Sequence, residues 1–391
     1  MPSSPPNVFE ELSRLCEESG VDQSLDFLEH HFRRDKEYFK LFEVLKMRCR
    51  HRMGLPLIYS QEPDDLNETQ QRELEDSLLD ACREIGTLFF KAGKMHEGWM
   101  YLQPVGDKQL SEKLIRSIEP DEENVDAIVN VAITQGAAPV YGFQVMLTHY
   151  GTCNGITAYD TNVGRFDKAT EKGMACALLH HLYNELVSNV RHSIGETLPD
   201  RAEEAATQNL AELMKSHPEL TDNGAHHIDT THLASLMRIA RAVDDAADLK
   251  MACELAEYGS GLAEDFCYPG SAPFENTYAD HLAFYRALLG IEVDEAVLHF
   301  QKKVDAAEPS DIGPVVEETF LDFLVRLGRT EEAIEFATEK LMGKHDSLGI
   351  APNVLNVAET QSELSKLMEF YQGDDDLLGY GVCLLKKRVQ Q

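Results

Sequence analysis

The chain has 391 residues, with 36 basic and 68 acidic side chains, and its formal net charge at pH 7 is −32. A surface this acidic repels phosphate backbones, which argues against wholesale nucleic-acid binding and favours basic partners. Hydrophobic residues make up 43% of the chain, enough for a sizeable core, but no window reaches the roughly 20 apolar residues that a membrane span needs.

The predicted elements are almost all helices, because helix-forming residues dominate and strand-like alternation is scarce. In the first part of the chain we expect a helical pair over 8–31, with a break at Ser19-Gly20. The clearest pair covers 68–92 and 95–103, with a short turn between the two helices. The other helices expected in this part cover 32–53, 108–118, 123–135 and 139–149.

The middle of the chain is less regular. Residues 151–164 contain several turn-forming residues, a long helix is predicted over 167–194, and 195–224 is polar with one short helix near 200–215. The helical pattern resumes at Asp229, a residue type that often caps a helix N-terminus. The remaining expected helices cover 230–244, 246–258, 275–289, 293–306, 313–327, 330–342, 359–371 and 375–388.

A short phrase occurs twice in the chain, as Gly93–Gly98 and as Gly328–Ala333. Each copy follows an apolar helical run and opens a second helix, which is the pattern of a helix-turn-helix repeat. Small residues where two helices cross let their axes approach, and a glycine in the turn accepts the left-handed conformation that ends the first helix. The phrase therefore predicts how helices pair, and it is silent about any reaction.

This pattern resembles the tetratricopeptide repeat, a pair of antiparallel helices about 34 residues long. The residues that match its small, turn and large apolar positions are Gly86, Phe89, Gly93, Gly98 and Leu102 in the first copy and Leu324, Gly328 and Ala333 in the second. Leu321 and Ala337 depart from the pattern, and the Trp and Pro landmarks of the family are missing. The resemblance is to a degenerate relative, and it implies stacked helical hairpins and a role in binding peptides or proteins.

The expected architecture is one continuous α-solenoid of stacked antiparallel helical hairpins, a superhelix similar to that of the tetratricopeptide repeats. An N-terminal helical-repeat section covers 1–150, an irregular central helical section covers 151–228, and a C-terminal helical-repeat section covers 229–391. A chain of this length is long for one ordinary domain, whereas a repeat array can grow to this size as one body.

Histidines concentrate in the central section, where eight of the fifteen lie within 149–232. On the predicted helix 167–194, the side chains of His181, Glu185 and His192 fall within about 40° of one another and share one stripe. Imidazole is the commonest metal ligand, so this stripe is a candidate site for a divalent, zinc-like ion. The alternative is a solvated face of histidine and glutamate side chains, with no cofactor.

A second candidate metal cluster consists of His227, Asp229 and His232, which we expect to converge on a predicted helix start if they bind a metal. The spacing of these residues matches no zinc signature. The alternative is that Asp229 caps the helix, that His232 lies in its first turn, and that His227 is a loop residue.

A candidate nucleophile is Cys153, with His149 as its base. Thr152 is able to cap a helix that begins at Cys153, and a thiol at a helix N-terminus has a lowered pKa. The alternative is a buried structural cysteine and a histidine that interacts with the C-terminus of the preceding helix.

The cysteines and the N-terminus bear on the cellular compartment. The eight cysteines are scattered and include no Cys-x-x-Cys pair, which favours a reducing compartment over a disulfide framework. The first 18 residues contain no apolar stretch of signal-peptide length. We therefore expect a cytoplasmic protein that is not bound to a membrane.

The function that these patterns favour is a helical-repeat scaffold that binds a protein or peptide partner, possibly a basic one. The chain contains no phosphate loop, no Gly-x-Gly-x-x-Gly after a strand, no Gly-x-Ser-x-Gly elbow and no His-Glu-x-x-His. One alternative is a metal-binding protein or hydrolase-like enzyme that uses the central histidines. Another is a structural subunit that associates with itself through unlike charged patches.

Overall fold

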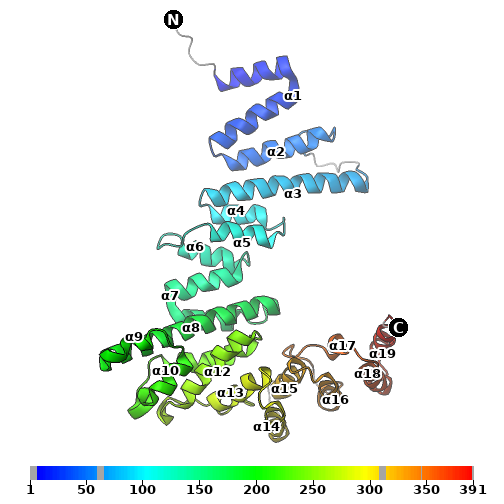
Figure 1. The fold of residues 1–391 in the computed structure, drawn as a ribbon. Helices are drawn as coiled ribbons and strands as arrows, with labels where there is room; N and C mark the ends of the chain where they lie inside the picture. Colours follow the sequence, from blue (N-terminus) through cyan, green and yellow to red (C-terminus); the bar gives the residue numbers. More distant parts are fainter. Residues whose placement is uncertain (1–6, 60–65, 308–313, 345, 390–391) are drawn as a thin grey trace. The chain divides into compact units, whose positions relative to one another are not determined.

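The computed structural model describes residues 7–59, 66–307, 314–344 and 346–389, and Figure 1 shows their fold. Over these residues the protein has 19 α-helices and no β-strand, which confirms the prediction of an all-α protein. No helix in the described part of the chain is long and apolar enough to cross a membrane. Residue 313, the expected start of one helix, lies outside the described residues.

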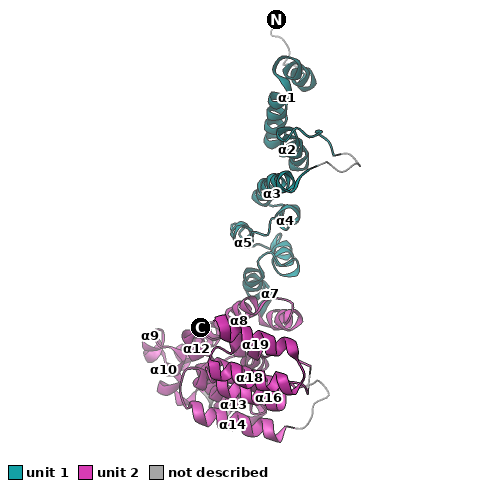
Figure 2. Ribbon diagram, turned by 90° about the vertical axis from the view of Figure 1, so that its right-hand side faces the viewer, with its two compact units in different colours: residues 1–151 teal, residues 152–391 magenta. Residues whose placement is uncertain are grey.

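The chain forms two compact units, residues 1–151 and 152–391, which Figure 2 distinguishes by colour. The boundary falls inside α7 (Pro139–Asn162), at Gly151, where the backbone leaves the helical conformation with φ 80° and ψ 176°. The second unit holds the residues of both the central and the C-terminal sections that we expected from the sequence.

Unit 1 is built from helices that contact their neighbours in the chain, so α1 contacts α2, α2 contacts α3, and α3 contacts α4. Between α2 and α3 the core includes Leu41, Ile85 and Phe89, all of them buried. The elements are α1 (Val8–Arg34, with a non-helical residue at Gly20), α2 (Tyr38–Arg52), α3 (Glu68–Lys91), α4 (Met95–Leu102), α5 (Lys108–Arg116), α6 (Val125–Val129), the π-helix η1 (Asn130–Thr134) and the first part of α7.

The close contact between α3 and α4 depends on glycine. A Cβ atom on Gly86 would lie 2.6 Å from the Leu102 side chain, and one on Gly98 would lie 2.5 Å from the Phe90 ring. Gly93, in the turn between the two helices, has φ 74°. The packing and turn roles that the sequence predicts for these three glycines are confirmed.

Two expected element limits are wrong. The helix expected over 32–53 is interrupted, because Lys36 has φ 57°, which separates α1 from α2. The segment 151–164, which we expected to be irregular, continues α7 as far as Asn162. Its threonines suit a helix because their hydroxyl groups donate to carbonyls one turn back, as Thr157 does to the carbonyl of Cys153.

Unit 2 begins with the end of α7 and the long helix α8, which contacts both α11 and α12. In turn α11 contacts α12, and both contact α13. The elements of this first half are α8 (Lys168–Thr197), η2 (Pro199–Arg201), α9 (Ala202–Ala205), α10 (Leu210–Ser216), η3 (Pro218–Gly224), α11 (Thr230–Ile239), η4 (Ala240–Ala242), α12 (Ala246–Ser260) and η5 (Glu264–Phe266).

In the second half of unit 2, helices α13 to α16 contact in chain order, α16 contacts both α17 and α18, and α18 contacts α19. An aromatic cluster joins several of them, since the Phe284 ring lies 4.8 Å from Phe323 and 5.6 Å from Phe274. The elements are α13 (Thr277–Leu288), α14 (Val293–Ala306), α15 (Val315–Arg326), α16 (Thr330–Lys340), α17 (Val354–Val357), α18 (Gln361–Gly373) and α19 (Leu377–Val389).

Candidate functional site

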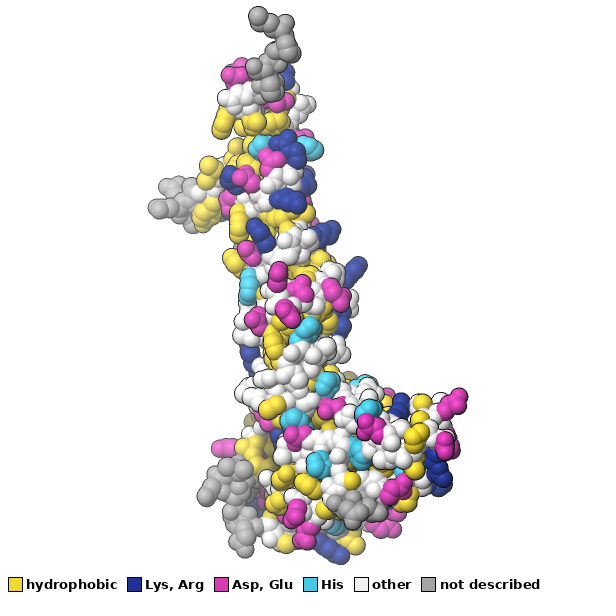
Figure 3. All heavy atoms as spheres, turned by 90° about the vertical axis from the view of Figure 1, so that its left-hand side faces the viewer, with side chains coloured by type: hydrophobic (Ala, Val, Ile, Leu, Met, Phe, Trp, Pro, Cys, Tyr) yellow, Lys and Arg dark blue, Asp and Glu magenta, His cyan; other side chains and the backbone are white. Residues whose placement is uncertain are grey.

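The histidine stripe predicted on the long helix lies on α8. His181 and Glu185 are partly buried, and His192 is exposed, with its Nε2 atom 3.4 Å from the carboxylate of Glu196. On the face drawn in Figure 3, histidine side chains occupy separate places among acidic and basic side chains. Over the described residues, no group of three or more His, Cys, Asp or Glu side chains is placed to hold a metal ion.

In the second predicted cluster, Asp229 and His227 make hydrogen bonds within the fold. Asp229 is the N-cap of α11 and accepts hydrogen bonds from the backbone N–H groups of Thr231 and His232, which confirms the alternative interpretation of this residue as a cap. The Nδ1 atom of His227 lies 3.2 Å from the hydroxyl of Tyr258, and that hydroxyl also accepts from the His227 backbone N–H. Burial, with a smaller effect of His226, lowers the pKa of His227.

The two histidine clusters lie beside each other in unit 2. Asn189 on α8 donates from its side-chain amide to the backbone carbonyl of His227, at 2.9 Å. This contact places the loop before α11 against the helix that carries His181 and His192. The contact is made through an amide and a carbonyl, not through converging imidazoles.

The candidate nucleophile and base lie on opposite sides of Gly151. His149 and Cys153 are both exposed, whereas Thr152 is buried. The alternative interpretation of Cys153 as a buried structural cysteine is therefore wrong. The carbonyl of Cys153 accepts a hydrogen bond from the Thr157 hydroxyl.

The structure brings together a different cysteine, histidine and aspartate, which the sequence analysis missed. Cys176 and His180 lie one turn apart on α8 and both reach Asp248 on α12. The Cys176 thiol donates to one carboxylate oxygen at 3.0 Å, and the His180 Nε2 atom lies 2.6 Å from the other. The only hint in the sequence is the four-residue spacing of Cys176 and His180, because Asp248 is far away along the chain.

The chemistry of this cluster is that of a structural contact. Burial and the hydrogen bond to Asp248 raise the pKa of Cys176 to about 12, so the thiol is protonated at neutral pH. Burial alone would raise the pKa of Asp248, but the hydrogen bonds from Cys176 and His180 outweigh it and lower this pKa. The carboxylate stands between the thiol and the imidazole, and a nucleophilic cysteine needs the imidazole as its direct neighbour.

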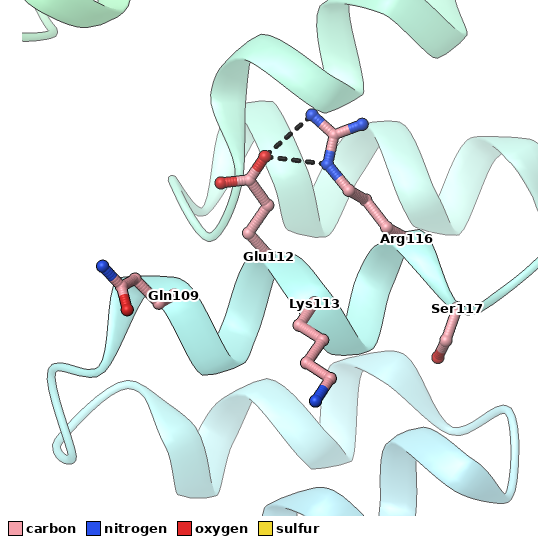
Figure 4. A pocket seen from close by; sticks show the side chains of 5 residues that line it. All are labelled: Gln109, Glu112, Lys113, Arg116 and Ser117. Carbon is pink, nitrogen blue, oxygen red and sulfur yellow. Dashed lines mark hydrogen bonds and ion pairs between the residues drawn. The ribbon is translucent and has the colours of Figure 1, made fainter.

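A pocket of about 430 Å³ lies beside α5 and is drawn in Figure 4. Its lining residues come from one helix and the residue that follows it, and Arg116 is paired with Glu112 at 2.7 Å. The Arg116 guanidinium also lies 4.5 Å from the centroid of the Tyr141 ring. The charge of Arg116 is therefore balanced by a neighbour on the same helix.

Arg241 also lies over an aromatic ring, but it has no ion pair with a carboxylate in the described part of the chain. Arg241, in η4, is partly buried, and its guanidinium carbon lies 4.7 Å from the centroid of the Phe274 ring. Its Nε–H group donates to the carbonyl of Arg238 at 3.1 Å. Within the described part of the chain, no carboxylate lies within 4.0 Å of the Arg241 guanidinium. Burial lowers the pKa of Arg241.

The residues around Arg241 fix its position. Arg326 on α15 donates to the backbone carbonyls of Arg241 and Val243 and lies over the Phe284 ring at 5.4 Å. Arg238 is paired with Asp160 at 2.9 Å. The main chain of η4 is thus held from α15, while the Nη atoms of Arg241 have no hydrogen-bond partner in the described structure.

Further ionisable residues surround the Arg241 side chain. Asp322 lies 3.8 Å from Arg326, and burial raises the pKa of its carboxyl group. His281 is buried and stacks on the other side chain of the site, Phe274, at 4.2 Å. Burial lowers the pKa of His281 to about 3, so its imidazole is neutral. Three aspartates lie near these three arginines: Asp160 pairs with Arg238, Asp322 lies beside Arg326, and Asp244 acts on Arg326 and pairs with Lys172.

No known protein family matches this chain, and no curated protein sequence matches it significantly.

Proposed function

We propose that this protein is a helical-repeat binding scaffold, and that Arg241 in unit 2 holds a carboxylate or phosphate group of a protein or peptide partner. The observation that supports this proposal is a partly buried guanidinium on an aromatic ring, without an ion pair among the described residues. Burying an unpaired charge is costly, and an oxyanion would supply the missing partner. The planar guanidinium suits carboxylate and phosphate oxygens because it presents parallel N–H groups.

The net charge of the chain further limits the chemistry that we expect of the partner. A surface with a net charge of −32 attracts basic side chains, whereas the Arg241 site attracts one oxyanion. A peptide that ends in a free carboxylate and carries lysine or arginine upstream satisfies both conditions. Capture of a terminal carboxylate is a known mode of peptide recognition.

The same proposal includes the finer points of architecture and location. The glycine-dependent contact between α3 and α4 supports degenerate repeats similar to the tetratricopeptide family. All eight cysteines are free thiols, which supports a reducing compartment such as the cytoplasm. The described residues offer no comparable observation for a metal site.

Isothermal titration with two matched peptides tests the proposal. Both peptides have the same sequence of five residues, in which alanine and lysine alternate. One ends in a free carboxylate and the other in an amide. We expect binding of the carboxylate form alone, competition by inorganic phosphate, and a loss of roughly tenfold or more in affinity for Arg241→Gln, because a charged hydrogen-bonding group is removed.

Arg116→Gln is the matched control, because Arg116 also lies over an aromatic ring but is already paired with Glu112. This variant should bind the carboxylate peptide as the wild type does. Equal binding of the amide peptide, or unchanged binding by Arg241→Gln, would show that Arg241 does not hold an oxyanion.

A further inference from the structure

Asp322, on α15, is a partly shielded carboxylate without a hydrogen bond. Its side chain is 29% exposed, and among the described residues no group donates a hydrogen bond to either of its carboxylate oxygens. Its ion pair with Arg326, at 3.8 Å, is too long for a hydrogen bond. The acceptor positions of Asp322 are therefore not used by the described part of the chain.

Other shielded carboxylates in unit 2 have several hydrogen-bond partners. Asp280 on α13 accepts from the backbone N–H group of Asn276 and from the ammonium group of Lys303. Glu318, one turn before Asp322 on α15, accepts from three backbone N–H groups in the loop that precedes α17. A carboxylate that loses water is normally satisfied in this way, so Asp322 has acceptor capacity for a donor from outside the chain.

Two cations near Asp322 are held by other groups. Burial raises the pKa of Asp322, and both cations, Arg326 and Lys168, oppose this effect. Arg326 donates to two backbone carbonyls in the segment that carries Arg241. The Nζ atom of Lys168 lies 3.6 Å from the carboxylate of Glu171. Neither cation therefore satisfies the oxygens of Asp322 in the described structure.

Arg241 and Asp322 are opposite charges that lie near each other without pairing. The Nη1 atom of Arg326 donates to the backbone carbonyl of Arg241 and lies 3.8 Å from the Asp322 carboxylate, so both residues border the same nitrogen atom. The Arg241 guanidinium lies over the Phe274 ring instead, more than 4.0 Å from the carboxylate. A ligand with an oxyanion and a cation is able to contact Arg241 with one group and Asp322 with the other.

We propose that Asp322 binds the basic side chain of the partner's last residue, whose terminal carboxylate is held by Arg241. This role of Asp322 rests on the proposed function of Arg241, and it specifies a C-terminal lysine or arginine as the ligand. The flexible four-carbon stem of a lysine lets its ammonium group reach Asp322 while the carboxylate stays on Arg241. The net charge of −32 favours basic side chains anywhere on the surface, whereas Asp322 selects one position of the peptide.

Isothermal titration with two matched peptides tests the role of Asp322. Both peptides have an acetylated N-terminus, four alanine residues and a free terminal carboxylate. One ends in lysine and the other in norleucine, an apolar residue of similar length. We expect the wild type to bind the lysine peptide roughly tenfold more tightly, as for one ion pair in a partly shielded site. Asp322→Asn should bind both peptides equally, with wild-type affinity for the norleucine peptide.

Asp294→Asn is the control for the loss of one negative charge. Asp294 lies on α14, its side chain is 84% exposed, and it pairs with Arg329. This variant should keep the wild-type preference for the lysine peptide. The role of Asp322 would be overturned by a lysine preference that survives in Asp322→Asn, or by an equal loss of this preference in Asp294→Asn. It would also be overturned if Asp322→Asn lost affinity for both peptides, because Asp322 would then support the fold or the position of Arg241.

The same peptides with an amidated C-terminus distinguish this role from the proposed function. Arg241→Gln should weaken binding of both carboxylate peptides to a similar extent, whereas Asp322→Asn should weaken binding of the lysine peptide alone. A carboxylate requirement that holds, together with a lysine preference that is absent or independent of Asp322, contradicts the role of Asp322 alone. Amidated peptides that bind as tightly as the carboxylate forms contradict the proposed function and the role of Asp322 together.

Discussion

At the scale of single residues, Asp248 determines the state of the Cys176 thiol. The thiol donates to the carboxylate, and this contact adds to burial in raising the pKa of Cys176 to about 12. We predict that Asp248→Asn increases the rate of Cys176 alkylation by iodoacetamide at pH 9, because the negative charge that disfavours the thiolate is removed. Mass spectrometry of the labelled peptides measures the rate.

Cys253 provides the internal control for this experiment. Its pKa is also raised to about 12, but burial is the main cause and Glu257 contributes, so Asp248→Asn should leave its rate unchanged. If Cys176 and Cys253 respond alike, the variant has opened the fold, and if neither responds, Asp248 does not control the thiol.

The same contact predicts how stability depends on pH. The pKa of Asp248 is lowered in the folded state, so its stabilising contacts are present above the unfolded value of about 3.9 and are lost as the pH falls further. The thiol of Cys176 has a raised pKa, so its contribution is complete below the unfolded value of about 8.5 and is lost as the pH approaches about 12.

We therefore expect the free energy of unfolding of the wild type to exceed that of Asp248→Asn by most between about pH 5 and pH 8. Urea unfolding of both proteins at pH 3, 6 and 10 measures the difference. A difference that does not change with pH would mean that Asp248 acts through its shape alone.

At the scale of elements, the crossing of α3 and α4 leaves no room for a side chain at Gly98. We predict that Gly98→Ala lowers the free energy of unfolding by about 1–3 kcal/mol, because the new methyl group displaces the Phe90 ring. Urea unfolding followed by circular dichroism measures the change.

Gly195→Ala is the matched control for this substitution. Gly195 lies inside α8, and a Cβ atom there would be 3.8 Å from the Cβ atom of Ala202, an ordinary contact. This variant should be as stable as the wild type or more stable, by up to about 1 kcal/mol. Equal losses in both variants would mean that the loss in Gly98→Ala does not come from the close crossing of α3 and α4.

The elements that the sequence predicts best are those whose cause is local. The turn glycine Gly93 and the cap Asp229 act on neighbouring residues, and the structure places both as predicted. The segment 151–164 was not predictable from turn-forming residues, because its threonine hydroxyl groups find carbonyl partners within the helix. Its residue types are compatible with both states, and packing in three dimensions decides between them.

The candidate site could not be predicted from the sequence, because it also depends on packing in three dimensions. Arg241 meets Phe274 and Arg326, and no local pattern connects these three residues. The histidines of the central section are close in sequence, but the structure gives them separate partners: His227 contacts Tyr258, His192 pairs with Glu196, and His180 reaches Asp248. The net charge follows directly from the composition, but whether an arginine has a carboxylate partner is known only from the structure.

At the scale of the whole molecule, each unit has a hydrophobic core of its own. The cores of unit 1 use residues from Tyr38 to Val145, and the aromatic cluster of unit 2 lies around Phe284. We predict that residues 152–391 expressed alone are helical and unfold in one cooperative transition, because the contacts of this core are contained in the fragment. Far-ultraviolet circular dichroism against temperature measures both properties.

A fragment that begins at residue 168 is the informative comparison. It lacks the end of α7, including the buried Tyr159 and the Asp160 that pairs with Arg238. It should be less stable than the fragment 152–391. If the longer fragment is disordered, the two units depend on each other for folding.

Gly20 and Gly151 interrupt α1 and α7 in nearly the same way, with φ 82° and ψ −171° at the first and φ 80° and ψ 176° at the second. Each conformation is the mirror image of an extended one that ordinary residues adopt freely, so only an achiral residue or a D-amino acid reaches it without strain. Neither glycine would bring a Cβ atom within 4 Å of other atoms, so packing does not select it. The chirality of the backbone therefore selects the residue at both interruptions, and glycine is the one encoded amino acid that adopts this conformation without strain.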